Sequence, residues 1–311
     1  MLGIKLSRFE PIKHTEGPRS PAHVPMFAII GIIVVFGAVI GGYLLEKGHL
    51  AVLLQPAELV IIGGAALGTV FVANPIAVVI QMLKGIAGAF GSSPYNKAGY
   101  LDALKMLYSI FQYARKEGLV KLEADVDDPS KSAIFSKFPR FLKDHHALHF
   151  VCDTLRTAVS GGAGHFELDQ MMETDMEVHH HEMNQPVAAL TTMADALPGL
   201  GIVAAVLGVV ITMGALGGPP EEIGHKVAAA LVGTFLGILL CYGLFGPLAS
   251  AMGKRNDSEH QYYQVLRVAI VAFVKGISPI LAVEFARRAI PHLHRPTFKQ
   301  MEESCRQAPK S

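Results

Sequence analysis

Charged residues are absent from two long stretches in the second half of this chain. No Asp, Glu, Lys or Arg occurs in Ala196–Pro220 or in Val227–Gly253, and only the polar segment Glu221–Lys226 separates the two. A helix rises about 1.5 Å per residue and the hydrocarbon core of a bilayer is about 30 Å thick, so roughly 20 such residues cross it. The backbone finds no hydrogen-bond partner in lipid, so each stretch must be helical. The sequence therefore predicts a transmembrane hairpin.

Two further stretches without charge lie near the start of the chain. They are Met26–Leu45 and Leu59–Leu83, and Asn74 with Pro75 is expected to end the membrane part of the second. The first stretch is too long and too far from Met1 for the apolar region of a secretory signal, so we expect it to be retained. The predicted fold class is an all-α polytopic membrane protein with four transmembrane helices and a helical cytoplasmic domain. We expect the four helices at about 26–45, 57–74, 196–219 and 227–251.

The distribution of Lys and Arg predicts the orientation of the chain. Both tails carry more Lys and Arg than Asp and Glu, whereas the short loops Glu46–Leu50 and Glu221–Lys226 carry one basic residue each. Since basic residues favour the cytoplasmic side, both termini and the long middle segment are expected in the cytoplasm. The expected domains are a cytoplasmic N-terminal tail (1–25), a first transmembrane pair (26–83), a cytoplasmic helical domain (84–193), a second transmembrane pair (194–252), and cytoplasmic C-terminal helices with a tail (253–311).

Apolar residues at helical spacing fill the middle and the end of the chain. One helix is expected from Leu101 to a stop at Gly118, and a second from Leu142 to the pair Gly161–Gly162. A third should run from Phe166 directly into the third membrane span. After the fourth span the helical pattern resumes, breaks near Gly276–Pro279 and continues to Ile290. Sustained alternation with a period of two residues is absent, which argues against strands.

Motifs typical of enzymes are also missing. There is no P-loop, no G-x-S-x-G and no C-x-x-C among Cys152, Cys241 and Cys305. Gly199–Ala204 matches G-x-G-x-x-A, but it lies inside an apolar run without the strand that a dinucleotide site needs. Adjacent residues on a helix point about 100° apart, so His179–His181 cannot form one metal-binding face and is interpreted as a solvated one. We therefore expect no enzyme, no cofactor or metal, and no nucleic-acid partner.

Small residues recur four apart within the predicted spans, a spacing that lets helices approach closely in lipid. The pairs are Gly37/Gly41, Gly64/Gly68, Ala204/Gly208 and Gly233/Gly237.

Few polar features interrupt the spans. Pro198 and Pro247 each remove a backbone donor, and Thr234 offers a hydroxyl that could instead bond to its own helix. Asp195 and Glu58 lie at span ends, where a carboxylate can stay hydrated. No span has a carboxylate near its middle, although ion-driven membrane proteins need an ionisable group at that depth. If ions cross here, the carboxylate must belong to another polypeptide.

Six segments of the chain together resemble the MotA family of flagellar stator A subunits, within the MotA/TolQ/ExbB superfamily. The resemblance covers about 27–303 in order. The segments are Gln55–Ile62, Asp195–Val210, Val232–Gly243, Gly246–Ala249, Ala282–Arg288 and Arg295–Phe298.

The resemblance implies a ring of five A subunits around a dimer of MotB in the bacterial inner membrane. MotB would supply the ion-binding aspartate, and ion flow would drive torque on the rotor protein FliG. The resemblance further implies that Thr234 and Tyr242 lie in the span that lines the ion path. The segment Val232–Tyr242 is similar to the proton-driven branch, so the expected ion is a proton.

The resemblance also implies roles for two other pairs of residues. Pro198 and Pro247 correspond to prolines linked to conformational coupling. Arg115 and Glu123 correspond to cytoplasmic charges that act on the rotor, although an ordinary solvated surface is the alternative interpretation of their positions.

Two other functions remain open. An ExbB/TolQ-like proton channel subunit shares the ring arrangement but energises envelope processes, and such chains typically have three spans, so four favour the stator. A self-contained secondary transporter needs a polar substrate site between repeats at mid-membrane. No repeat and no such cluster is evident in the sequence.

Overall fold

The computed structural model describes residues 26–214 and 217–307, so the expected N-terminal tail 1–25 lies outside the described residues. Every regular element in the described ranges is a helix. The α-helices are α1 (Met26–Leu45), α2 (Leu50–Leu53), α3 (Pro56–Ala73), α4 (Ile76–Ala89), α5 (Lys97–Glu117), α6 (Glu123–Asp127), α7 (Pro139–Leu142), α8 (His145–Val159), α9 (His165–Met213), α10 (Pro220–Leu240), α11 (Gly246–Val274), α12 (Pro279–Ala289) and α13 (Phe298–Arg306). Two short 3₁₀ helices, Leu119–Leu122 and Phe135–Lys137, and one π-helical segment, Cys241–Phe245, complete them.

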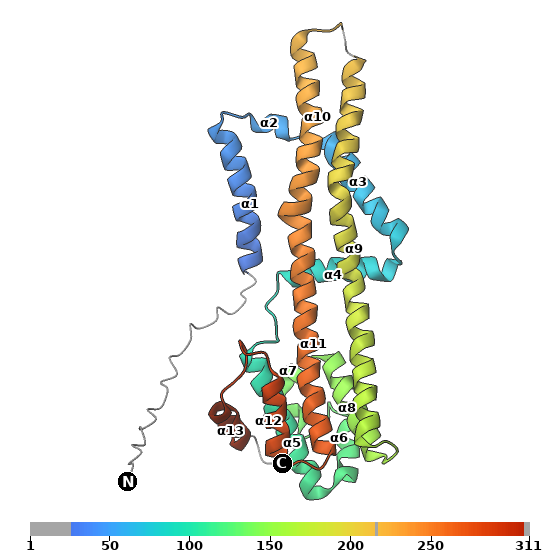
Figure 1. The fold of residues 1–311 in the computed structure, drawn as a ribbon, viewed down its shortest axis with the longest axis vertical. Coiled ribbons are helices and arrows are strands. Elements are labelled where there is room, and N and C mark those ends of the chain that lie inside the picture. Colours follow the sequence, from blue (N-terminus) through green and yellow to red (C-terminus); the bar gives the residue numbers. More distant parts are fainter. Residues whose placement is uncertain (1–25, 215–216, 308–311) are drawn as a thin grey trace, which may run out of the picture.

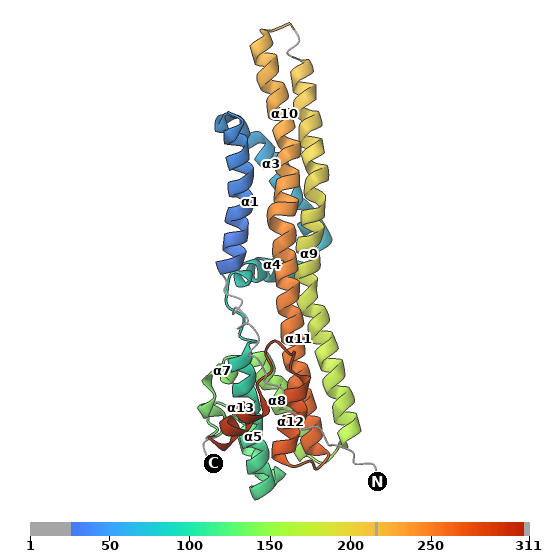
Figure 2. The same cartoon turned by 60° about the vertical axis from the view of Figure 1, so that its left-hand side comes forward.

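Two long antiparallel helices form the axis of the molecule (Figures 1 and 2). Helix α9 has 49 residues, which corresponds to a length of about 74 Å. Its C-terminal part, from Ala196, is uncharged and can lie within a bilayer. The charged N-terminal part is long enough to continue well outside the bilayer. Its partner consists of α10, the π-helical segment and α11 joined end to end. Four helices in the described ranges are long and apolar enough to span a membrane, which confirms the predicted fold class.

The connection at the far end of this pair differs from the prediction. The third span was expected to reach residue 219, but α9 ends at Met213, and the fourth helix already begins at Pro220. Gly217 has a positive φ of 114°, and Pro219 follows, so the helix cannot continue there. The segment Glu221–Lys226 is the first part of α10 rather than a loop.

The π-helical segment has a local cause in the sequence. Pro247 has no N–H, so the Gly243 carbonyl four residues earlier loses its helical donor. The preceding residue, Gly246, donates instead to the Cys241 carbonyl, five residues back. A bulge of this kind absorbs one residue and allows the helix axis to continue, as Figure 1 shows between α10 and α11.

Small residues bring α9 and α10 into direct backbone contact. A Cβ on Gly201 would lie 2.8 Å from the Gly233 carbonyl oxygen, and one on Gly237 would lie 2.5 Å from that of Leu197. Gly208 faces Ala230 in the same way. The prediction of close packing is therefore confirmed at Ala204/Gly208 and Gly233/Gly237.

The other two small-residue pairs behave differently. Where a Cβ would stand on Gly37, Gly41, Gly64 or Gly68, no atom lies within 4 Å. The prediction of close packing is wrong for these pairs within the single chain, because α1 and the outer face of α3 have no neighbouring helix there (Figure 1).

The remaining apolar helices surround the central pair. Helix α3 packs against α9 and ends at Ala73 with Asn74 as its C-cap, as predicted. Helix α4 lies across the long helices, and Arg255 donates a hydrogen bond to its Gly88 carbonyl. Helix α1 stands apart and approaches the pair at the π-helical segment, where a Cβ on Gly243 would lie 2.9 Å from Val35 Cγ1.

A hydrophobic core separate from the packing of the membrane helices lies at the lower end of the long helices (Figure 1), and we call it the basal core. It is built from α5–α8, α12, α13 and the charged parts of α9 and α11. Gly118 and Gly161 adopt positive φ at the predicted helix ends, and the break near Gly276–Pro279 is also confirmed. The second predicted helix begins later than expected, because Asp144 caps α8 by accepting a hydrogen bond from the Ala147 N–H at 3.1 Å.

Candidate functional site

Thr234 and Pro198 lie on opposite sides of the α9–α10 contact. Thr234 follows Gly233 on α10, and its Cα is 3.3 Å from the position of a Cβ on Gly201. Pro198 precedes Gly201 by less than one helical turn on α9 and is half-buried. Both predicted residues therefore lie within about one helical turn of the tightest part of the hairpin.

The Thr234 hydroxyl has no hydrogen bond to its own helix. Other threonines in the apolar helices do bond in this way: Thr212 donates to the Gly208 carbonyl at 2.8 Å, and Thr69 donates to that of Ala66 at 2.8 Å. Thr234 is half-buried and no hydrogen bond to another described residue is present. The alternative interpretation, a hydroxyl that bonds to its own helix, is therefore not supported. Its hydroxyl remains available to a group outside the chain.

Tyr242 and Pro247 both belong to the π-helical break. Tyr242 lies within the segment and its side chain is 72% exposed in the single chain. Pro247 occupies the first turn of α11 and is also exposed. Neither lies in the α9–α10 contact, so the structure separates this pair of residues from Thr234 and Pro198 along the helix. A tyrosine exposed within an apolar span must face lipid or another chain.

Arg115 and Glu123 lie near the lower end of the molecule, on either side of the turn that follows α5. Arg115 is in the last turn of α5 and Glu123 is the first residue of α6, and both are exposed. Neither forms an ion pair with another described residue. Their neighbours do: Glu117 binds Lys116 at 3.3 Å and Lys121 at 2.7 Å.

Arg115 also lines a shallow groove between α5 and the start of α12. The groove is formed by Tyr108, Gln112, Arg115 and Lys116 on one side and Ser278, Pro279 and Ile280 on the other. Lys116 is paired with Glu117 at 3.3 Å, so the unpaired Arg115 on one wall and the N-terminus of α12 on the other are the groups that favour an anion here.

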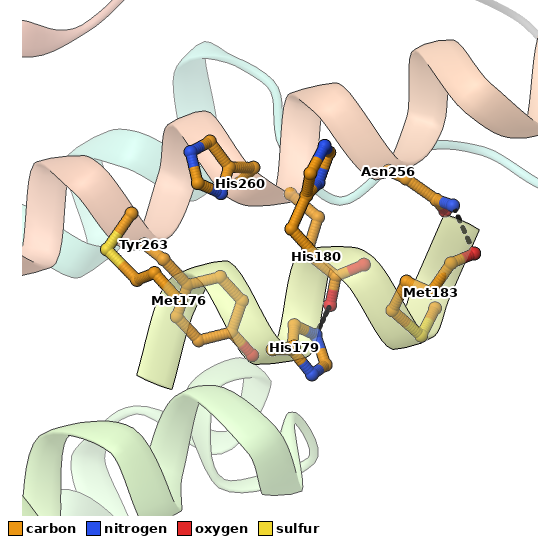
Figure 3. A pocket seen from close by; sticks show the side chains of 8 residues that line it. Met176, His179, His180, Met183, Asn256, His260 and Tyr263 are labelled. Carbon is orange, nitrogen blue, oxygen red and sulfur yellow. Dashed lines mark hydrogen bonds and ion pairs between the residues drawn. The ribbon is translucent and has the colours of Figure 1, made fainter. Parts of the chain in front are cut away.

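Two of the three histidines singled out in the sequence, His179 and His180, lie between α9 and α11 (Figure 3). His179 Nε2 is 3.4 Å from Glu259 Oε1, and the rings of His180 and His260 are 4.7 Å apart between centroids. His181 is exposed. The prediction of a solvated face is therefore right for His181 and wrong for the other two, because α11 covers their side of α9. Among the described residues no group of three or more His, Cys, Asp or Glu could hold a metal ion.

Several charged or titratable groups surround His179. Glu259 comes from α11 and His146 from α8, whose ring centroid is 5.0 Å away. The hydrogen bond that His179 donates to Glu259 raises the pKa of His179, against the opposing effect of burial. His179 lies more than four helical turns before Ala196, outside the apolar part of α9.

Glu284 carries the main ion pair of the segment Ala282–Arg288. It accepts hydrogen bonds from Arg287 Nε at 2.6 Å and from Arg288 Nε at 2.9 Å. Arg287 holds the pKa of Glu284 below its usual value. Arg287 also donates to the Pro296 carbonyl at 3.0 Å, so this segment ties the end of α12 to the turn before α13.

Glu58 is another residue that sequence reasoning placed wrongly. It was expected to stay hydrated at the end of a span, but it is only 6% exposed. Its Oε2 lies 2.5 Å from the position of a Cβ on Gly233, deep in the contact with α10. The sequence offered one signal: Glu58 begins one span, and another span carries the repeated glycines Gly233 and Gly237. Spacing alone could not show that these two helices meet.

Pro186 is a further residue that the sequence analysis overlooked. It is buried within α9, where a proline interrupts the helical hydrogen bonds. Its position inside a long helical pattern was the available signal.

Comparison with protein families agrees with these observations. Residues 29–118 match the model described as Motility protein A N-terminal. Residues 143–265 match the model of the MotA/TolQ/ExbB proton channel family. The first match covers most of α1 and all of α3.

Individual proteins match over nearly the whole chain. The chain is 40% identical to Motility protein A of Salmonella typhimurium over 281 residues, which is 90% of this chain and 95% of the relative. Motility protein A of Escherichia coli is also 40% identical, again over 90% of this chain and 95% of the relative. Chemotaxis protein LafT of Vibrio parahaemolyticus is 35% identical over 89% of this chain and 98% of LafT.

Solved structures show the same architecture. The flagellar MotAB stator complex from Bacillus subtilis contains a chain with a TM-score of 0.66 and 26% identity, covering 82% of this chain and 92% of that one. A chain of the C. jejuni MotAB structure has a TM-score of 0.71 at 18% identity, over 86% of this chain and 96% of that one, and shows the shared fold alone. Four apolar helices, two family matches and relatives covered almost end to end lead to one conclusion: the chain belongs to the Motility protein A family, within the MotA/TolQ/ExbB proton channel family.

Proposed function

We propose that this chain is the A subunit of a flagellar stator of the bacterial inner membrane, which forms a proton channel with MotB. The α9–α10 hairpin carries the proposal: its apolar part contains a free hydroxyl at Thr234 and an exposed Tyr242, but no ionisable carboxylate. A proton path needs such a group at membrane depth. The relatives' MotAB complexes indicate where it comes from, since a second protein is present in them.

The exposed apolar surface supports assembly into a ring. Helix α1 has no buried residue in its apolar window, and α9 exposes a row of large side chains. In the hairpin these are Ile202, Val206, Val209, Val210 and Met213. Lipid can cover part of this surface, and neighbouring copies with the MotB helices cover the rest. The proposed stoichiometry is five A subunits around a MotB dimer, with both termini and the segment 84–193 in the cytoplasm.

The prolines provide a place where the helices can bend. Pro198 interrupts α9 directly beside the backbone contact with α10, and Pro247 creates the π-helical break in the partner helix. Each proline removes one helical hydrogen bond, so bending there meets less resistance than in an uninterrupted helix. We assign to them the coupling between proton binding and movement of the basal core.

The rotor contact is assigned to Arg115 and Glu123. They are exposed and unpaired on a turn where adjacent charges neutralise one another. Exposed ion pairs are worth about 0–1 kcal/mol each, which suits a contact with FliG that must form and break repeatedly. One proton crossing 100 mV releases about 2.3 kcal/mol, so a single step can exceed such a contact.

A flux measurement tests the function. The chain would be reconstituted into liposomes alone and together with MotB, and proton entry followed with a pH-sensitive dye under an imposed potential. We expect flux only with both proteins, and Thr234→Val should reduce it while leaving the complex intact in pull-down. Robust proton flux through the chain alone would overturn the proposal, because the missing carboxylate would then not be required.

A further inference from the structure

A buried carboxyl group lies at a three-helix contact and has no role assigned to it in the function proposed above. Glu58 belongs to the first turn of α3 and is 94% buried by the chain itself, since only 6% of it is exposed. Its Oε2 has no hydrogen-bond partner among the described residues. Buried polar atoms are almost always paired, so an unpaired carboxylate oxygen requires an explanation.

The opposite helices are shaped to receive this group. A Cβ on Gly233 would lie 2.5 Å from Glu58 Oε2, 3.2 Å from its Cδ and 3.2 Å from the Cβ of Ala204. Any side chain larger than glycine at position 233 would therefore occupy the space of the carboxyl group. Glycine on α10 and alanine on α9 leave a cradle of the size that Glu58 fills.

No cation compensates the carboxylate. The apolar parts of α3, α9 and α10 contain no Lys, Arg or His, and α2 contains no charged residue. The nearest Lys along α10 is Lys226, two helical turns from Gly233, and it is bound to Glu222 at 3.0 Å. The N-terminus of α3 gives no local hydrogen bond either, because neither the cap residue Gln55 nor Glu58 accepts a backbone N–H with its side chain.

An ionised carboxylate in such surroundings loses most of its hydration, and the partial positive charge at the N-terminus of α3 offsets only a small part of that loss. The usual outcome is that the group binds a proton and becomes neutral. A neutral acid also has an O–H donor, which can bond to a backbone carbonyl of the adjacent helices, whereas an ionised carboxylate can only accept.

We infer that Glu58 is a proton-binding site of this chain, separate from any carboxylate supplied by a partner. One carboxylate oxygen takes a proton from a hydronium ion of the aqueous phase and leaves a water molecule, and the neutral acid packs against Gly233 and Ala204. Release of the proton restores the charge and drives the first turn of α3 away from α10. Because Thr234 adjoins Gly233, this movement alters the packing of α10 beside the Thr234 hydroxyl, which lies on the proposed proton path.

Infrared spectroscopy can observe the proton directly. The complex of this chain with MotB would be measured at neutral pH in water and in deuterium oxide, where the carbonyl band of a protonated side-chain acid shifts. Glu58→Gln and Glu58→Met both remove the acid while keeping the approximate size of the side chain. The control is Glu222→Gln, an exposed carboxylate paired with Lys226.

The expected result is loss of one protonated-acid band in Glu58→Gln and Glu58→Met, and loss of ionised-carboxylate absorption alone in Glu222→Gln. Loss of ionised-carboxylate absorption in the Glu58 variants, with the protonated bands unchanged, would overturn the inference. So would failure of both neutral variants to accumulate in the membrane, because packing would then require the charge. Proton flux is not part of this readout, so the result is independent of the proposed function.

Discussion

Gly237→Ala tests the backbone contact between α9 and α10, on which the membrane part of the fold depends. The new Cβ would lie 2.5 Å from the Leu197 carbonyl oxygen and 3.0 Å from the Cα of Gly201. Both atoms belong to the backbone, so no side chain can turn aside. The two helices would have to separate by about 1 Å to restore ordinary contact, and overpacking of this kind costs about 1–3 kcal/mol.

Helix propensity acts in the opposite direction and must be subtracted. Replacing glycine by alanine within a helix stabilises it by about 0.8–1 kcal/mol. The matched control is Gly224→Ala on the same helix, since no atom lies within 4 Å of its new Cβ. Gly237→Ala should therefore be less stable than Gly224→Ala by about 1–3 kcal/mol. Gly224→Ala itself should be slightly more stable than the unmodified chain.

The measurement is unfolding of the purified complex in mixed micelles, followed by circular dichroism while the fraction of denaturing detergent increases. Reduced recovery of the complex with MotB should accompany the loss of stability. Equal stabilisation by both substitutions would refute the reasoning, because it would show that the helices are far enough apart to accept a methyl group at Gly237.

Three other changes test the remaining parts of the structure. Pro247→Ala restores the missing N–H and should convert the π-helical segment to regular helix, so torque measured on tethered cells should fall while MotB is still recovered in pull-down; loss of the complex would show that the proline serves packing only. Arg115→Glu and Glu123→Lys should each reduce stator recruitment to the flagellar base, seen by fluorescence microscopy, without changing membrane insertion, and wild-type swimming by both single variants and by the double variant would mean that the rotor contact lies elsewhere. The raised pKa of His179 means that its bond to Glu259 stabilises the basal core fully below the unfolded pKa of about 6.5 and is lost as pH rises through the folded pKa. Thermal unfolding should therefore show stability falling with rising pH in that range, and Glu259→Gln should flatten this dependence; an unchanged slope would contradict it.

The sequence by itself determined the composition of the membrane part and the ends of several helices. Runs without charge can only be helical in lipid, and this alone predicted four spans. Local rules were equally sufficient at Gly118 and Gly161, where a positive φ favours glycine, and at Asn74 before Pro75. The motif segments also indicated the family, since together they are long and occur in the family's order along the chain.

The sequence was less informative where a residue's surroundings come from another helix. Glu58 looked hydrated because it begins a span, yet α10 buries it, and the decisive residue, Gly233, lies far away along the chain. His179 and His180 looked solvated because a triplet cannot face one way, yet α11 covers that side of α9. Of four similar small-residue pairs, only the two on α9 and α10 meet a neighbour within the chain.

The physical reason is the range of the forces involved. Backbone hydrogen bonding, proline and glycine geometry and the exclusion of charge from lipid act within a few residues, so they can be read along the chain. Burial of a carboxylate and the contact distance between two helices depend on which surfaces meet, and only the tertiary structure brings Glu58 to Gly233 and Leu197 to Gly237.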